Sequence, residues 1–558
     1  MKFLKYTLLL FLGTSFMFSC DEEDDLIDQR LALVPDQPDP VTPPNPMSGN
    51  ADFTNYVAIG NSLTAGFADA ALFPLGQLNS FPVILSEQFS AAGGGSFVFP
   101  DIVSGDGFGS IDEEGNPVGR SFIDLAVALQ AIAGVEGVAV EDAIQNLPGS
   151  PLTLSSNTGM DLNNFGVPGA RIVDAVTPGY GAFNPFYGAF QSSPMASMIG
   201  DAASANGTFF TAWLGSNDIL GYAINGGASG EAFNPMDPGT STDVPTFVSA
   251  LTDVLNDLSA NGASGVILNI PPITIIPFFQ TVTQLSGGID LIPLDQVTAD
   301  AVNAGFAEYN QGLGAALQLE LIDQAELERR TINFSAGNNP PVITDENSIT
   351  QNLDISAAFM APAGTVILPN LRQASIDPTT GLSDLFPLTA LGTIGSEAIP
   401  GDLTSTIGVG VPVPDSLTLT IAEQVFCITQ YATYNGIIAQ QVAARPNLFL
   451  VDVGPLFADV FGLSAAAAAG LGLSPEAQAA ADGVLGTEVS GVNLVPLSLS
   501  QEELYNSIWS TDGIHANPRG NALIANEIIA VINEAFEASI QTVNPLDFPG
   551  VNAPFGAP

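Results

Sequence analysis

The chain has 558 residues and is strongly acidic: 10 Lys and Arg oppose 58 Asp and Glu, which gives a formal net charge of −48. Nucleic-acid phosphates are bound by basic surfaces, so this charge excludes nucleic acid as a partner. Hydrophobic residues make up 46% of the chain, which excludes a wholly disordered protein, and the length allows one large domain with insertions.

The N-terminus has the pattern of an export signal. A short basic region precedes an apolar run over residues 8–18, which is too short to span a bilayer comfortably. Cys20 follows, with an acidic run at 21–25. This order resembles the lipobox of bacterial lipoproteins, and the acidic run resembles the surface-export signals of Bacteroidetes lipoproteins. The resemblance implies a signal peptide over 1–19, a lipid anchor on Cys20 and a place in the cell envelope, at the outer membrane. The alternative is an ordinary cleaved signal peptide with a free Cys20.

The rest of the chain divides by composition. Residues 20–50 are acidic and Pro-rich, which predicts an extended, disordered tether. We expect a folded domain over 51–545 and a short tail over 546–558. Within the domain, the Gly-rich stretch 92–160 and the Pro- and Thr-rich stretch 325–415 are predicted insertions, each a candidate cap or β-rich subdomain.

Strand-like and helix-like segments alternate through the domain. Buried strands are predicted over 53–60, 209–214, 265–270 and 448–453. Helices are predicted over 82–89, 244–260, 298–319 and 417–444, with two short Ala-rich helices in 464–481. Asn517 and Pro518 have the cap and first-position chemistry of a final helix that ends near residue 539. This alternation predicts an α/β fold with a mainly parallel sheet.

Ser62 lies in the segment Gly60-Asn61-Ser62-Leu63, between the first predicted strand and a helix. A serine in such a turn exposes its hydroxyl, and the backbone N–H groups that follow can stabilise an anion. The segment is not the GxSxG elbow of α/β-hydrolases, because Thr64 stands where the second Gly belongs. Taken alone, the turn is as easily structural.

Two further motifs follow predicted strands or precede helices. Gly169, in Val167-Pro168-Gly169-Ala170, leaves its N–H unobstructed, although a tight-turn glycine is the simpler explanation. Asn217, in Gly215-Ser216-Asn217-Asp218, offers an amide donor, although a side chain that caps the turn is equally common.

His515 is the one histidine of the chain, in Asp512-Gly513-Ile514-His515. A single histidine excludes His-rich zinc sites and a His-based facial triad. Three residues apart in a turn, the Asp512 carboxylate can hold the Nδ1–H of the imidazole and leave Nε2 facing a serine. We expect activity to fall as the pH drops through an ordinary histidine pKa of roughly 6–7.

In this order the four motifs resemble the blocks of the SGNH hydrolases, the GDSL esterase/lipase family. The resemblance implies the family's flavodoxin-like three-layer α/β/α fold, here with large insertions, and hydrolysis of an ester through an acyl-enzyme. It implies Ser62 as the nucleophile, His515 as the general base and Asp512 as its orienting acid. It also implies Gly169 and Asn217 as oxyanion donors, and no cofactor or metal for the reaction. Asn61 replaces the family's commoner Asp at a position that is not the nucleophile.

The ester itself stays open at this point. The apolar segment 273–279 suits a fatty acyl chain or is ordinary core, so the substrate is a lipid or an acylated glycan. The alternatives are a carbohydrate O-acetyl esterase and a non-catalytic surface binding protein. The acidic run 112–114 lacks the spacing of a calcium-binding loop and is interpreted as a solvated turn, and Cys427 as a buried, inert thiol.

Overall fold

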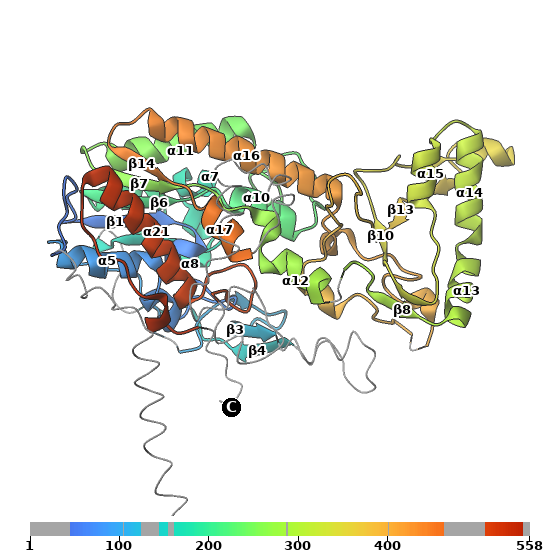
Figure 1. Cartoon of the computed structure of the whole chain (residues 1–558), viewed down its shortest axis with the longest axis horizontal. Helices are drawn as coiled ribbons and strands as arrows, with labels where there is room; N and C mark the ends of the chain where they lie inside the picture. The colour runs from blue at the N-terminus through green and yellow to red at the C-terminus, as the bar shows by residue number, and fades with distance from the viewer. Residues whose placement is uncertain are drawn as a thin grey trace, which may run out of the picture. The chain divides into compact units, whose positions relative to one another are not determined.

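A five-stranded parallel sheet lies at the centre of the α/β domain (Figure 1). The computed structural model describes residues 45–103, 105–123, 144–154, 161–285, 288–399, 401–461 and 508–550. In spatial order the strands are β14 (Leu448–Val451), β7 (Ser264–Leu268), β6 (Phe209–Trp213), β1 (Tyr56–Gly60) and β5 (Asn164–Gly166). The prediction of an α/β fold with a mainly parallel sheet is confirmed.

The strands are buried on both faces, which explains why they read as continuous apolar runs in the sequence. Every residue of β1 and of β6 is buried. Four strands lie within a few residues of the predicted ranges. The fifth, β5, was not predicted because three residues are too few to show a period.

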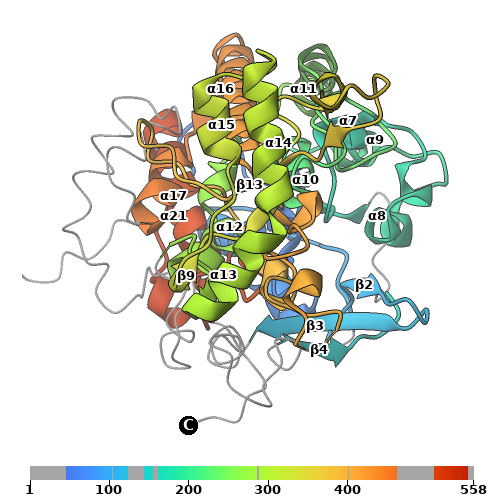
Figure 2. The ribbon, with the colours of Figure 1, turned by 90° about the vertical axis from the view of Figure 1, so that its right-hand side faces the viewer.

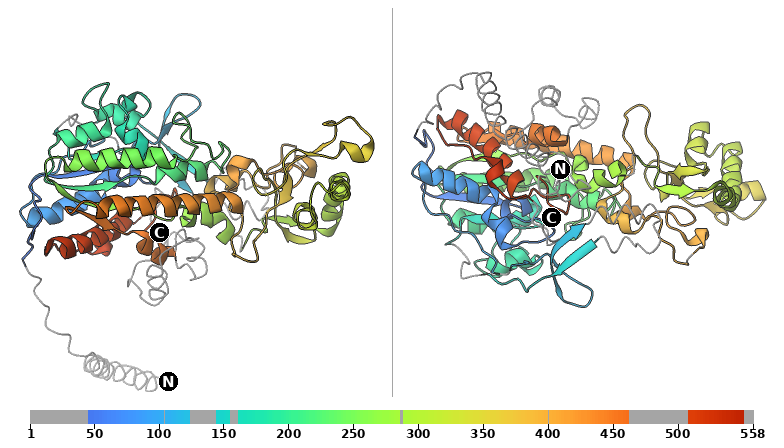
Figure 3. Two further views of the ribbon diagram at one scale, coloured as in Figure 1. Left: turned by 90° about the horizontal axis from the view of Figure 1, so that it is seen from above. Right: turned by 60° about the horizontal axis from the view of Figure 1, so that its bottom comes forward.

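Helices cover both faces of this sheet (Figures 2 and 3). One group contains α7 (Ile172–Val176), α9 (Met198–Ser204) and α11 (Val244–Ser259), which pack on one another. The opposite group contains α5 (Phe81–Ala91) and α21 (Pro518–Phe536), which also pack together. The long helix α16 (Ile421–Ala443) packs on β14, on α11 and on α10 (Asn217–Ile224).

Shorter elements connect these units. They are the α-helices α3 (Ser62–Ala65), α4 (Pro74–Leu78), α8 (Pro185–Phe190), α12 (Pro277–Leu285) and α17 (Gly454–Phe461). The 3-10 helices are η3 (Tyr180–Ala182), η4 (Ile273–Ile275), η5 (Ser356–Phe359), η6 (Leu388–Gly392), η7 (Leu403–Ser405), η8 (Asp415–Leu417) and η9 (Pro545–Asp547).

Two helix predictions need correction. The helix predicted over 298–319 is two helices, α13 (Gln296–Gly305) and α14 (Ala307–Gln318). The break falls at Phe306, where the preceding Gly305 weakens the helix and the Phe306 ring packs on Phe334. Helix α16 begins at Ile421 rather than 417, because Thr420 and Glu423 form a capping box there.

The stretch 92–160 contains a small antiparallel sheet in its described part. Its strands are β2 (Ser110–Ile111), β3 (Pro117–Ile123) and β4 (Ile144–Pro148). An isolated bridge joins Leu72 to Phe108 and connects this sheet to the segment that follows α3.

The second insertion has a hydrophobic core of its own, whose buried residues run from Ile292 to Val409. Its core therefore begins before residue 325 and includes α13, α14 and α15 (Gln324–Arg330). Short antiparallel pairs complete it: β8 (Ile292–Leu294) with β9 (Gly337–Asn339), β10 (Val342–Thr344) with β13 (Leu371–Gln373), and β11 (Leu353–Asp354) with β12 (Ile367–Leu368).

Other sequence predictions have mixed outcomes. Cys427 is buried and free, and burial raises the pKa of its thiol, as expected for an inert side chain. In the segment 273–279, Phe279 and its apolar neighbours are buried in the main core, so ordinary core is the correct interpretation. The predicted signal peptide with Cys20, most of the tether and the Ala-rich helices in 464–481 lie outside the described residues. Within the described part of the chain, no helix combines the length and the apolar character needed to cross a bilayer.

Candidate active site

Ser62 is the first residue of α3, two residues after β1 ends. Gly60 permits this turn, because a Cβ there would lie 2.0 Å from the Thr64 hydroxyl and 2.7 Å from the Trp213 carbonyl oxygen. The Asn61 side chain accepts a hydrogen bond from Leu63 N (3.1 Å) and caps the helix. The amide oxygen of Asn61 therefore caps the helix as the carboxylate oxygen of an aspartate would.

His515 comes from the opposite end of the chain, in the turn before α21. Asn517 caps that helix by accepting hydrogen bonds from Arg519 N and Gly520 N, and Pro518 occupies its first turn, as predicted. The turn closes through Ser510 N, which donates to the His515 carbonyl oxygen at 2.8 Å. The cap and the turn thus fix the imidazole at one edge of the sheet.

The structure brings Ser62, His515 and Asp512 into one hydrogen-bonded chain. His515 Nε2 lies 2.8 Å from Ser62 Oγ, and His515 Nδ1 lies 2.8 Å from Asp512 Oδ2. Ser62 is 6% exposed and His515 is 8% exposed, so the chain is shielded from bulk water. This is the geometry of a serine, a base and an acid that orients the base.

Asp512 is held as an anion. Its Oδ1 accepts hydrogen bonds from Ser510 Oγ, Ile514 N and His515 N, and its Oδ2 also accepts one from Ala70 N. Burial raises the pKa of the carboxyl group, but the charge of His515 and these hydrogen bonds outweigh burial and hold the pKa well below its usual range.

Gly169 and Asn217 lie at the same edge of the sheet as Ser62. Gly60 pairs with Gly166 on one side and with Trp213 on the other, so the loops after β5, β1 and β6 leave the sheet side by side. Asn217 Nδ2 donates to the Ala170 carbonyl oxygen at 2.9 Å, which joins two of these loops.

Gly169 requires glycine for its backbone conformation. Its φ is +80°, in the left-handed region that side chains disfavour, and a Cβ there would meet nothing closer than 3.9 Å. The space beside this N–H is therefore open. The loops thus place a second amide hydrogen on Asn217 Nδ2 and the backbone N–H groups of Ser62 and Gly169 at this end of the sheet.

Asp218 has a structural role at this edge of the sheet. It is fully buried, and its Oδ2 accepts a hydrogen bond from Ile172 N at 2.8 Å, which ties α10 to the start of α7. Burial raises the pKa of Asp218 to about 7. The carboxyl group thus holds the Gly169 loop against the helix that begins at Asn217.

The sequence analysis missed a buried ion pair that supports the Asp512 turn. Asp69 Oδ1 accepts a hydrogen bond from Thr511 N at 3.0 Å, and Asp69 Oδ2 lies 2.8 Å from Arg120 Nη2. The Thr511 hydroxyl donates to the Ser121 carbonyl oxygen at 2.6 Å. Arg120 comes from β3 in the first insertion, and its guanidinium lies over the rings of Phe73 and Phe122. No local pattern signals this contact, because 51 residues separate its partners.

An aromatic wall stands beside the imidazole. The ring of Phe67 lies 5.0 Å from that of His515, and Phe67 packs edge to face on Phe186 of α8. Phe108 of the first insertion also packs on Phe186. The wall therefore unites three separate segments of the chain around the candidate base.

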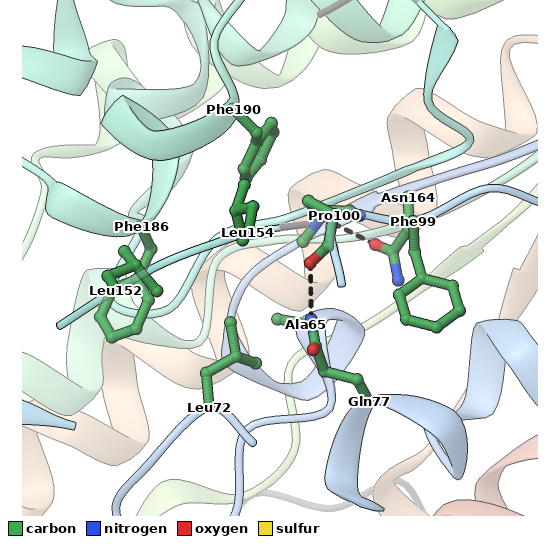
Figure 4. Close-up of a pocket in the computed structure, with 11 residues that line it drawn as sticks. Ala65, Leu72, Gln77, Phe99, Pro100, Leu152, Leu154, Asn164, Phe186 and Phe190 are labelled. Carbon is green, nitrogen blue, oxygen red and sulfur yellow. Dashed lines mark hydrogen bonds between the residues drawn. The ribbon is translucent and has the colours of Figure 1, made fainter. Parts of the chain in front are cut away.

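A small apolar pocket lies behind this wall (Figure 4). Ala65, at the end of α3, and Gly166, at the end of β5, line its inner side. Most of the remaining lining is apolar: Leu72, Phe99, Pro100, Leu152, Leu154, Phe186 and Phe190. Gln77 and Asn164 complete the lining, and Gln77 Nε2 donates a hydrogen bond to the Pro100 carbonyl oxygen at 2.8 Å. Ser62, His515, Gly169 and Asn217 are not among the residues that line this pocket.

Comparison with protein-family models, with curated proteins and with solved structures finds none that matches this chain.

Proposed function

We propose that the protein is a serine ester hydrolase that works through an acyl-enzyme. The observation that carries this proposal is the chain Ser62–His515–Asp512, with both hydrogen bonds at 2.8 Å, from turns 453 residues apart in sequence. A serine turn and a histidine turn have no local structural reason to meet with both imidazole nitrogens engaged in this order.

The mechanism follows from these contacts. Ser62 Oγ attacks the ester carbonyl carbon while His515 Nε2 takes the hydroxyl proton, and the negative oxygen of the tetrahedral intermediate is met by the oxyanion donors. The intermediate collapses, the C–O bond to the alcohol breaks, and His515 returns the proton to that alcohol. Water then attacks the acyl-enzyme with His515 again as the base, which releases the acid and restores Ser62. Asp512 orients the imidazole and stabilises its positive charge.

We further propose membership of the SGNH hydrolases, with their three-layer flavodoxin-like architecture. The support is the order of the four motifs and the meeting of their strands at one sheet edge. The lipid anchor on Cys20 and the place in the cell envelope are part of the same proposal and depend on the N-terminal motif alone.

The rings of Phe67 and Phe186 beside His515 favour an acyl group longer than acetyl. Each methylene that packs against them contributes about 0.8 kcal/mol, or roughly fourfold in kcat/KM. The ester is then one with a short or medium apolar acyl chain, and its alcohol part is left open.

The test is hydrolysis of p-nitrophenyl esters from acetate upwards by purified protein. We expect kcat/KM to rise from acetate to butyrate and hexanoate, and Ser62→Ala and His515→Ala to abolish turnover. Ser193→Ala, at an exposed serine, is the matched control and keeps full activity. A maximum at acetate would favour the O-acetyl esterase alternative. Equal activity of the wild type and Ser62→Ala, or none in either, would reject the proposal in favour of a binding protein.

A further inference from the structure

Three carboxyl groups converge far from Ser62 in the chain, where the second insertion meets the α/β domain. They belong to Glu346, just after β10, to Asp415 in η8 and to Glu423 in the first turn of α16. One carboxylate oxygen from each lies within 4.8 Å of the other two. Glu346 is exposed, Asp415 is half-buried and Glu423 is buried. Figure 1 shows α16 extending from the sheet toward the insertion.

A buried hydroxyl group is aimed at the same place. Tyr222, in α10, is fully buried, and its hydroxyl has no hydrogen-bond partner. A Cβ placed on Gly227 would lie 2.7 Å from Glu423 Oε1 and 2.9 Å from the Tyr222 hydroxyl oxygen, so both oxygens border one point. One carboxylate oxygen of Asp415, Oδ1, is also buried without a partner. Buried polar atoms without partners are rare, and here they belong to the cluster itself.

The charge around the cluster is not balanced by protein groups that contact it. The guanidinium of Arg372 lies nearby, but it is engaged by both Asp345 and Asp384. Among the described residues, the ion pairs of Arg372 are therefore made to these two aspartates and not to Glu346, Asp415 or Glu423.

We propose that Glu346, Asp415 and Glu423 bind a calcium ion, with the Tyr222 hydroxyl as a further oxygen for the ion or for its water. The donor set is entirely oxygen, which suits a hard cation. Opposed oxygens around Ca²⁺ stand about 4.6–5.2 Å apart, so the observed spacing fits within one calcium shell. Mg²⁺ demands a near-ideal octahedron, which three irregular loop and helix positions do not supply.

The ion would strengthen a junction where an isolated backbone bridge already pairs Ile343 with Val413. Glu346 belongs to the insertion, Glu423 to α16, and Tyr222 to the helix that begins at Asn217. Asn347 Nδ2 already donates to Glu423 Oε1 at 2.8 Å across the same junction. Calcium would therefore fasten the insertion to the domain that carries Ser62, and its role is structural rather than catalytic.

Calorimetric titration of chelator-treated full-length protein with CaCl₂ tests this site. We expect one ion per chain at this site, and a higher thermal midpoint in calcium than in chelator. Glu346→Gln changes an exposed residue and should fold normally; it should bind calcium roughly tenfold more weakly or worse. Asp415→Asn should lose the site. MgCl₂ in the same titration should bind more weakly than CaCl₂.

Glu113→Gln, in the exposed acidic turn, removes the same charge elsewhere and should leave the binding unchanged. The proposal fails if the wild type shows no heat of binding at millimolar calcium. It also fails if both Glu346→Gln and Asp415→Asn keep the wild-type affinity and stoichiometry, because calcium would then be bound elsewhere. Tighter binding of Mg²⁺ than of Ca²⁺ would overturn the choice of ion.

Discussion

The Asp512 carboxylate accepts hydrogen bonds from five donors, and the imidazole of His515 supplies one of them. The other four come from Ser510, Ile514, Ala70 and the backbone of His515. The four other donors therefore position the carboxylate, and the charge of His515 contributes most to keeping it ionised. At the scale of single residues, the imidazole and the carboxylate act as one coupled pair.

The pH profile should show this directly. The base must be neutral to take the Ser62 proton, so kcat/KM should fall at acid pH, where the imidazole gains a proton. Because the pKa of Asp512 is held well below its usual range, the acid limb should follow a single proton. A limb that follows two protons, or a profile flat down to pH 4, would contradict the assignment. Asp512→Asn should lower kcat by roughly 10³–10⁴-fold while the fold is kept.

At the scale of elements, strand β3 contacts the Thr511 turn through the Arg120–Asp69 ion pair and through the Ser121 carbonyl oxygen, which accepts from Thr511 Oγ1. Arg120→Met removes the partner of buried Asp69, whose pKa burial already raises despite Arg120. We expect a loss of about 3 kcal/mol in the free energy of unfolding, and a fall in kcat as the Thr511 turn loosens. Urea unfolding and ester kinetics measure the two effects. Unchanged kinetics in the folded variant would show that Arg120 does not support the turn.

The start of α21 serves both stability and the position of His515. Asn517→Ala should cost about 1 kcal/mol through the lost cap and should also lower kcat. Asp243→Ala removes the equivalent cap of α11, where Asp243 accepts from Thr246 N, and should cost a similar free energy with kcat unchanged. Equal effects of both variants on kcat would mean that the cap does not position the histidine.

The elements also show what a sequence can and cannot predict. The capping residues Asn517 and Pro518 predict the start of α21, because cap chemistry is local. The four motif residues at the sheet edge are predictable for a related reason: each directly follows a strand or precedes a helix. The pair Asp69–Arg120 is not predictable, since the turn and the hairpin that bring it together are set by tertiary packing. The break between α13 and α14 at Phe306 is not predictable for the same reason. Its ring packs on Phe334 in the core of the second insertion, and nothing in the local sequence indicates this contact.

At the scale of the whole molecule, the buried carboxyl groups should make the free energy of unfolding depend on pH. In chelator, Asp415 and Glu423 have folded-state pKa values near 8 and 7, above the roughly 4 expected of unfolded carboxyl groups. The folded state therefore binds more protons, and the free energy of unfolding should fall as the pH rises from 6 to 8.5. Denaturant midpoints in chelator measure this. Asp415→Asn should flatten the dependence, whereas higher stability at pH 8.5 than at pH 6 in the wild type would contradict it.

Ser62 and His515 are 453 residues apart in the chain, and this separation determines when the active site can form. A chain is synthesised from its N-terminus, so the nucleophile emerges long before its base. Until the turn before α21 docks against Ser62, the proposed hydrolase has a serine but nothing to activate it. If the chain is exported as proposed, catalysis would begin only after export and folding are complete.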